Sequence, residues 1–179
     1  MNSHSKPPQF NPAVLPMEFR PRMAYVSDEN HTKHYLIPGK IFASAQPFAI
    51  STIVGSGVAI CLWDSVHRIG GANHFMLPEG PEHGDNAARY GNVANPALLQ
   101  RMLELGAERK NLEAKIFGGS VSGINFGGEG ERLGERNVQA AEHFLRMNGI
   151  RTVHTEIGGT HGRKLVFQTD DGKAWAEEL

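Results

Sequence analysis

The chain has 179 residues, of which 40% are hydrophobic and 21% charged, a length and composition that suit one globular domain with a sizeable core. Its 18 Lys and Arg residues nearly balance its 19 Asp and Glu residues, so nothing in the charge favours binding to nucleic acid. No apolar run approaches the roughly 20 residues that span a bilayer, and the first residues lack the apolar segment of an export signal, so we expect a cytoplasmic protein without membrane insertion.

The first 33 residues contain five prolines and little apolar periodicity. This pattern is typical of an extended segment that has no face to pack. We therefore expect a flexible N-terminal arm over residues 1–33 and a folded domain over residues 34–179. At the start of that domain, Pro38-Gly39 predicts a turn between short strands at residues 35–37 and 41–44.

The centre of the chain carries two apolar runs rich in β-branched and aromatic residues, at residues 51–64 and 69–78. They predict two strands joined by a hairpin-like loop that contains the turn signal Asp64-Ser65. Gly55-Ser56-Gly57 interrupts the first run. Glycines inside a strand pattern usually mark a bulge or a close approach of two backbones.

The rest of the chain alternates between helical and strand patterns. Apolar residues at three-to-four spacing predict an amphipathic helix that begins near Asn95-Pro96 and ends at Gly106, and a second helix over residues 136–148. Alternating runs predict strands at residues 112–117, 150–153, 164–168 and 174–176, with Asp171-Gly172 as a hairpin turn between the last two. Residues 120–131 are Gly-rich and show almost no periodicity.

Several of these segments resemble the CheD family, bacterial chemotaxis proteins that deamidate specific glutamines of methyl-accepting chemoreceptors. A family segment Gly-Gly-x-x-His-x-Met-Leu-Pro is intact here at residues 70–78, and further matching blocks follow at residues 113–119, 133–137 and 158–164. The family segment Leu-Gly-Ser-Cys-Val-Ala matches residues 54–59, but the nucleophilic cysteine of the family falls on Gly57. The resemblance implies a layered α/β fold, an α-β-β sandwich in which a two-sheet core carries helices on one side. The pattern itself, with about eight strands and two helices, is compatible with this fold.

The resemblance also implies a catalytic set of a cysteine, a histidine seventeen positions later and a hydroxyl residue just upstream. Here these positions are Gly57, His74, and either Ser51 or Thr52, because a one-residue ambiguity in register leaves the hydroxyl open. A Cys–His pair with a third orienting group is suited to covalent hydrolysis of an amide. Taken alone, a histidine in an apolar strand is more often a hydrogen-bonded core residue, and Thr52 is simply a good strand former. Only the family block favours a catalytic role for them.

Neither of the two nearby nucleophiles is a good replacement for the missing thiol. Cys61, the single cysteine, lies roughly 13 Å from Gly57 if the strand rises about 3.3 Å per residue, and a buried cysteine is usually inert. Ser56 should point to the opposite face of the strand. A single cysteine also excludes an internal disulfide.

The sequence gives no support for a metal or a cofactor. His31 and His34 are expected in or near the arm, and no histidine pair has the helical spacing with a carboxylate that zinc proteases use. The glycine-rich run 127–134 lacks the phosphate-loop pattern and carries two carboxylates, so we interpret it as a flexible turn.

Two functions of different classes follow from these residues. The first is a protein-glutamine deamidase of the CheD type, impaired by Gly57. The second is a pseudo-deamidase that binds receptor helices or a CheC-like phosphatase without turnover. A nucleotide-binding regulator built on the glycine clusters is the weakest alternative.

Overall fold

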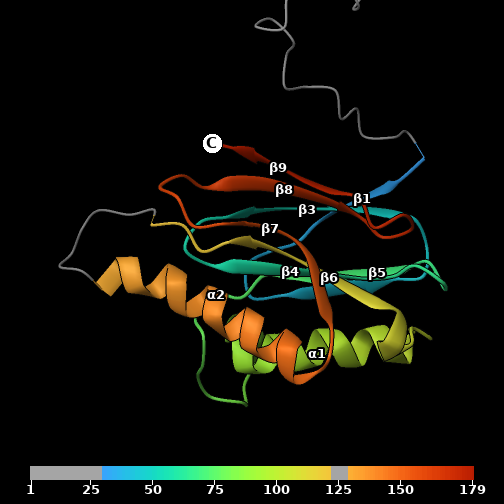
Figure 1. Cartoon of the computed structure of the whole chain (residues 1–179), viewed down its shortest axis with the longest axis horizontal. Coiled ribbons are helices and arrows are strands. Elements are labelled where there is room, and N and C mark those ends of the chain that lie inside the picture. The colour runs from blue at the N-terminus through green and yellow to red at the C-terminus, as the bar shows by residue number, and fades with distance from the viewer. Residues whose placement is uncertain (1–29, 122–128) are drawn as a thin grey trace, which may run out of the picture.

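The computed structural model describes residues 30–121 and 129–179. These residues form two β-sheets and two α-helices (Figure 1). A four-stranded sheet has the order β1-β3-β8-β9, and a five-stranded sheet has the order β2-β5-β4-β6-β7. The strands are β1 (Thr32–Tyr35), β2 (Ile41–Ser44), β3 (Phe48–Val54), β4 (Val58–Asp64), β5 (Ile69–Asn73), β6 (Leu112–Gly118), β7 (Arg151–Ile157), β8 (Arg163–Gln168) and β9 (Ala174–Glu178). The helices are α1 (Gly91–Glu104) and α2 (Glu129–Met147), and short 3-10 turns lie at Ala87–Arg89 and Arg109–Asn111.

Both helices cover the same face of the five-stranded sheet, and the four-stranded sheet packs on its other face (Figure 1). The five-stranded sheet is therefore the middle layer, and β4 is buried on both faces. Val58, Ile60 and Leu62 belong to the core on the helix side, whereas Ala59 and Cys61 belong to the core between the sheets. A strand buried on both faces reads as a continuous apolar run. The expected α-β-β sandwich with helices on one side is confirmed.

The longest apolar run of the sequence forms two strands in different sheets. We expected one interrupted strand over residues 51–64, but β3 belongs to the four-stranded sheet and β4 to the five-stranded sheet. Gly55-Ser56-Gly57 carries the chain from one sheet to the other. The next strand, β5, pairs with β4 as the predicted hairpin but ends at Asn73, before the expected end at residue 78. Only an isolated bridge between Val58 and Phe75 continues the pairing.

Both helices begin earlier than the sequence pattern predicted. Helix α1 starts at Gly91 and contains Pro96, which we had expected near its first turn. The Asn92 side chain pairs with both main-chain groups of Gly80 at 3.0 Å, a tertiary contact that extends the helix upstream of the proline. Helix α2 starts at Glu129, so residues 129–134 are helical and the expected flexible turn is wrong there. Residues 122–128 lie outside the described part of the chain.

The folded part begins before the expected boundary at residue 34. Strand β1 starts at Thr32 and pairs in parallel with β3. His31, whose side chain is 5% exposed, has its Nε2 atom 2.6 Å from the Asp170 carboxylate. His34 stacks on Phe42 with ring centroids 3.8 Å apart. His31, expected in the flexible arm, is instead held by a partner 139 residues away, whereas His34 lies within the folded domain, where its boundary was expected.

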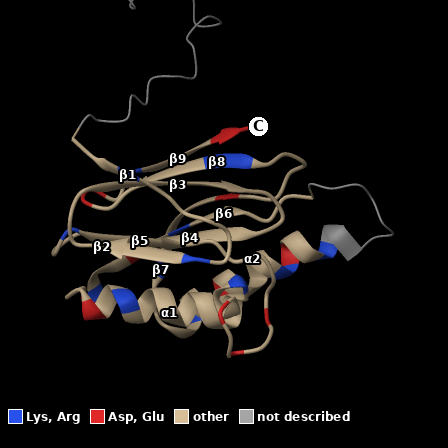
Figure 2. Cartoon of the chain, turned by 180° about the vertical axis from the view of Figure 1, so that it is seen from behind, with Lys and Arg blue, Asp and Glu red and all other residues tan. Residues whose placement is uncertain are grey.

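Charged side chains of both signs lie on α2 and near the strand ends, whereas those of α1, Arg101 and Glu104, are confined to its C-terminal end (Figure 2). Within the part of the chain that the structure describes, no helix is long and apolar enough to cross a membrane.

Candidate active site

His74 lies immediately after β5, where the chain leaves the middle sheet. Its carbonyl accepts a hydrogen bond from Gly39 N at 2.7 Å, and its N–H donates to Lys40 O at 3.2 Å. The turn at Pro38-Gly39 therefore fixes the backbone of the histidine, and its side chain is buried.

Thr52 provides a polar partner for His74. Its position on β3 turns the side chain into the layer between the sheets, where it is 1% exposed. Thr52 Oγ1 lies 2.9 Å from His74 Nδ1. Ser51 is the next residue along the strand, so its side chain points to the opposite face, and its carbonyl accepts from Leu36 N at 2.8 Å. The geometry brings Thr52, and not Ser51, to the histidine.

Gly57 faces the other nitrogen of the same imidazole. A Cβ atom built on Gly57 would lie 2.9 Å from His74 Nε2 and 2.8 Å from Phe75 O. A side chain at position 57 would therefore point directly at the imidazole nitrogen that Thr52 does not contact. Gly57 does not have a positive φ, so its backbone conformation is open to other residues, but a Cβ would require the histidine or the Phe75 carbonyl to shift.

The loop that carries Gly57 is held by all three of its carbonyl oxygens. Gly55 O accepts from Ser120 N at 2.9 Å, and Gly57 O accepts from Gly119 N at 2.8 Å. Ser56 O accepts from the Asn137 side chain at 2.8 Å. The N–H groups of Ser56 and Gly57, by contrast, donate no hydrogen bond to another described residue. Among the described residues, these two backbone donors of the loop are thus uncommitted.

Burial sets the charge of the histidine. Loss of hydration lowers the pKa of His74 to about 4, because the charged imidazolium is disfavoured in the interior. His74 is therefore neutral near pH 7. When Nδ1–H donates to Thr52 Oγ1, the lone pair of Nε2 faces position 57. In that tautomer the imidazole can accept a proton from a group at position 57.

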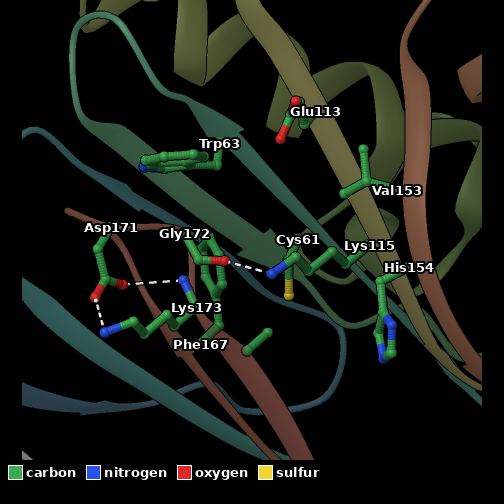
Figure 3. A pocket seen from close by; sticks show the side chains of 11 residues that line it. Cys61, Trp63, Glu113, Lys115, Val153, His154, Phe167, Asp171, Gly172 and Lys173 are labelled. Carbon is green, nitrogen blue, oxygen red and sulfur yellow. Dashed lines mark hydrogen bonds and ion pairs between the residues drawn. The ribbon is translucent and has the colours of Figure 1, made fainter.

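Cys61 lies in a different part of the inter-sheet layer. It lines a cavity of about 360 Å³ between the β8–β9 hairpin and the middle sheet (Figure 3). Neither Thr52, Gly57 nor His74 lines this cavity. Burial raises the pKa of the Cys61 thiol well above its ordinary value, while the charge of Lys115 opposes this shift weakly. The Lys115 ammonium donates to Gly172 O at 2.6 Å. The structure thus keeps Cys61 apart from His74, as the strand spacing predicted.

Asn137 also contacts this site, although it was named from the sequence only within the family-like segment 133–137. Asn137 of α2 is fully buried, and its amide nitrogen also donates to Met76 O at 3.0 Å. The signal that could have found it is a polar residue on the inner face of an amphipathic helix. Among the described residues, no cluster of three or more His, Cys, Asp or Glu side chains could hold a metal.

Comparisons with known proteins identify the family to which this chain belongs. Residues 76–178 match the family model described as CheD chemotactic sensory transduction. The chain is 46% identical over 146 residues to a probable chemoreceptor glutamine deamidase CheD 1 of Anaeromyxobacter dehalogenans, covering 81% of this chain and 84% of the relative. It is 43% identical over 141 residues to a probable chemoreceptor glutamine deamidase CheD of Rhodospirillum rubrum, covering 79% of each chain. A protein of the same name from Sulfurimonas denitrificans is 38% identical over 144 residues, which cover 80% of this chain and 92% of the relative.

The chain therefore belongs to the CheD family, and the resemblance stated from its motifs is confirmed. The matched segment of the family model begins at Met76, so it lies after Thr52, Gly57 and His74. The match therefore does not test the roles that the motif resemblance implies for these three residues.

Proposed function

We propose that this protein recognises methyl-accepting chemoreceptors at the glutamines that CheD proteins deamidate, and that Gly57 impairs its own turnover. The observation that carries the proposal is the direction of the missing side chain. A Cβ at position 57 would point at His74 Nε2, and Thr52 occupies the other imidazole nitrogen. The site thus has the hydroxyl and the base, and position 57 faces the base, but there is no nucleophile.

The expected family reaction assigns each of these groups a step. A thiol at position 57 would pass its proton to His74 Nε2, and the thiolate would attack the amide carbon of the glutamine side chain. The N–H groups of Ser56 and Gly57 are suited to stabilise the oxyanion. The imidazolium would return the proton to the leaving nitrogen, releasing ammonia and leaving a thioester. Water would then hydrolyse the thioester to glutamate and regenerate the thiol, so the reaction consumes one water and needs no cofactor.

The unmodified chain cannot form the thioester at position 57. Knockouts of a covalent nucleophile typically lose several orders of magnitude in turnover and keep the contribution of binding and of the oxyanion donors. We therefore assign this chain a binding function, as a pseudo-deamidase that holds receptor helices or a CheC-like phosphatase. This function would place it in the cytoplasm with the receptor segments concerned.

Exposed apolar side chains favour the binding function. Four exposed large apolar side chains, between 40% and 57% exposed, come from the three segments that build the site: Tyr35, Ile37, Ile53 and Met76. Others, such as Val66, Met147 and Val153, lie elsewhere on the described surface. The segment with Tyr35 and Ile37 is bonded to Ser51 and His74, Ile53 follows Thr52, and Met76 lies two residues after His74. Ile53, like Ser51, points to the outer face of the four-stranded sheet, so Met76 is the exposed apolar side chain of this set that is nearest to His74 in the chain. An exposed apolar side chain next to a polar site suits an amphipathic helix that presents a glutamine.

The proposal is tested by restoring the thiol. The unmodified chain, the Gly57→Cys variant and the Gly57→Cys, His74→Ala double variant are each incubated with a receptor cytoplasmic fragment, and ammonia is measured. We expect ammonia above background only from Gly57→Cys, after small shifts of both the His74 ring and the Phe75 carbonyl make room for the new Cβ. Glutamate at a defined receptor position, detected by mass spectrometry, identifies the target.

Binding is measured separately from chemistry. A pull-down with the receptor fragment and with a CheC-like protein at modest salt should retain the unmodified chain on at least one of them. Ammonia release by the unmodified chain would overturn the assigned effect of Gly57. Failure to bind either partner would overturn the binding function.

A further inference from the structure

The Asn137 side chain forms hydrogen bonds to two segments of the site. Its amide nitrogen donates to Ser56 O at 2.8 Å and to Met76 O at 3.0 Å. Ser56 is adjacent to Gly57, and Met76 lies two residues after His74. A single buried side chain from α2 therefore spans the loop of the nucleophile position and the segment of the base.

Helix α2 is brought close to these segments by a contact between glycines. A Cβ on Gly134 would lie 2.5 Å from Gly119 O, and a Cβ on Gly119 would lie 2.4 Å from Val138 Cγ2. Neither glycine has room for a side chain, so the helix backbone packs directly on the turn that follows β6. Gly119 in turn donates its N–H to Gly57 O. Gly134 and Asn137 are three residues apart and lie on one face of α2, so the same face that packs on the turn also bonds the site.

The main chain alone ties these segments at one point. Val58 N donates to Phe75 O at 3.0 Å, and Phe75 N donates to Val58 O at 3.0 Å. This bridge lies just beyond Gly57 and His74, whereas the Asn137 bonds lie at Ser56 and Met76. With the main-chain bridge alone, the two segments could pivot, and pivoting would change the distance between position 57 and His74 Nε2. The Asn137 bonds form a second attachment that opposes this motion.

We propose that Asn137 is a positioning residue that fixes the distance between position 57 and the His74 imidazole. The inference rests on the proposed function, because that distance matters only if the two positions act together. Asn137 is fully buried, and its role does not involve contact with a substrate. An uncharged donor is required here, since the carboxylate of an aspartate would face two carbonyl oxygens without a hydrogen to donate.

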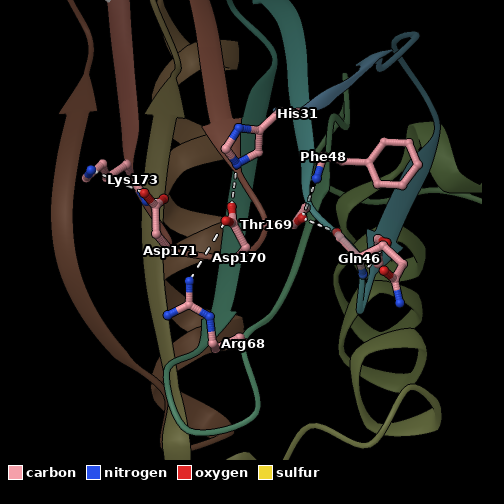
Figure 4. A network of polar contacts seen from close by, with 9 residues as sticks. His31, Gln46, Phe48, Arg68, Thr169, Asp170, Asp171 and Lys173 are labelled. Carbon is pink, nitrogen blue, oxygen red and sulfur yellow. Dashed lines mark hydrogen bonds and ion pairs between the residues drawn. The ribbon is translucent and has the colours of Figure 1, made fainter. Parts of the chain in front are cut away.

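The test compares Asn137→Ala with a matched control. Thr169→Val removes another fully buried polar group that makes two hydrogen bonds, from Phe48 N at 2.9 Å and to Gln46 O at 2.7 Å (Figure 4). That group lies at the far end of β3 from Thr52. Both variants lose buried hydrogen bonds and should be less stable, so a general loss of stability affects them equally.

The first readout is the titration of His74 by NMR in the unmodified chain, with His74→Gln used to identify the signal. In Asn137→Ala the pKa of His74 should rise by about one pH unit from its low value, because a looser site admits water to the imidazole. In Thr169→Val the titration should be unchanged. The second readout adds Gly57→Cys to both variants and measures the rate of thiol modification at pH 7. We expect a fall of about tenfold with Asn137→Ala and little change with Thr169→Val, because only the first moves the thiol from its base.

Asn137→Ser provides a milder variant if the alanine variant does not fold. Its hydroxyl retains one donor on a shorter side chain, so both readouts should move in the same direction by less. If the folded Asn137 variants match Thr169→Val in both readouts, the inference is overturned. If both readouts move as expected while Gly57→Cys releases no ammonia, the positioning role stands and the proposed deamidase chemistry fails.

Discussion

Two places between the sheets each hold half of a cysteine–histidine pair. At the chain crossing between β3 and β4, His74 and Thr52 are bonded, but position 57 is a glycine. At the cavity under the β8–β9 hairpin, Cys61 is present, but His154, which shares the cavity, is bonded to Glu156 at 3.0 Å. The described part of the molecule therefore has a base that faces a glycine at one place and a buried thiol, 1% exposed, at the other.

Burial acts on both groups in the same way and with opposite consequences. It favours the neutral form, so it lowers the pKa of His74 to about 4 and raises the pKa of the Cys61 thiol. A neutral imidazole is the form that accepts a proton, whereas a neutral thiol is the form that does not attack. The comparison shows that the reactivity of a thiol depends on its surroundings. Cys61 lies only four residues after position 57, but its surroundings keep it in the neutral, unreactive form.

The largest expected effect is a difference in thiol reactivity between the two places. In a Gly57→Cys, Cys61→Ala variant, the new thiol should react with iodoacetamide at pH 7 at least about 100-fold faster than Cys61 in the unmodified chain, because the thiolate is the reactive form. The rate is followed by mass spectrometry of the native protein. Rapid modification of Cys61 in the unmodified chain would contradict its inert environment and make it a candidate nucleophile again.

The next effect is a loss of stability at acid pH that depends on His74. The pKa of His74 is about 4 in the folded chain and about 6.5 unfolded, so the unfolded state takes up the proton first as the pH falls. Between pH 7 and pH 4.5 this linkage should remove on the order of 2 kcal/mol from the free energy of unfolding. Denaturant unfolding at both pH values measures it, and His74→Gln should lack that part of the pH dependence. An equal dependence in both proteins would mean that His74 is hydrated in the folded state.

Much of this architecture could be predicted from local patterns. The turns at Pro38-Gly39 and Asp171-Gly172, the β4–β5 hairpin and the strand before Gly118 each follow from residues that are close in the sequence. Contacts between segments that are separated in the sequence could not be predicted from local patterns. The assignment of β3 and β4 to different sheets, the early start of α1 and the packing of Gly134 on Gly119 all depend on contacts between different segments of the chain.

The candidate site shows the same division. His74 and Gly57 were found through family motifs, but the choice between Ser51 and Thr52 needed the direction of β3 side chains toward the five-stranded sheet. Asn137 makes its contacts across 81 and 61 residues, so no local pattern could have shown its two acceptors.

A smaller effect tests that choice of hydroxyl. Thr52→Val keeps the side-chain shape and removes the partner of His74 Nδ1, which should cost about 1 kcal/mol of folding stability, as loss of a buried hydrogen bond usually does. Ser51→Ala is the matched control and should change stability by less than about 0.5 kcal/mol, because Ser51 faces away from the core. Urea unfolding of the two variants decides between them. A larger cost for Ser51→Ala would reverse the assignment.

The smallest effect concerns the proposed division between an N-terminal arm and the folded domain. Deleting residues 1–29 should lower the melting temperature by less than about 2 °C, because these residues include five prolines and lack a periodic apolar face. Deleting residues 1–31 also removes His31, whose ring is bonded to Asp170, and should lower it by several degrees more. The loss would leave Asp170 with Arg68 at 3.9 Å as its ion-pair partner. Calorimetry of the two truncations therefore locates the start of the folded domain at the His31–Asp170 pair. If the shorter deletion alone accounts for most of the fall, residues before Asn30 stabilise the sandwich and the boundary moves toward the N-terminus.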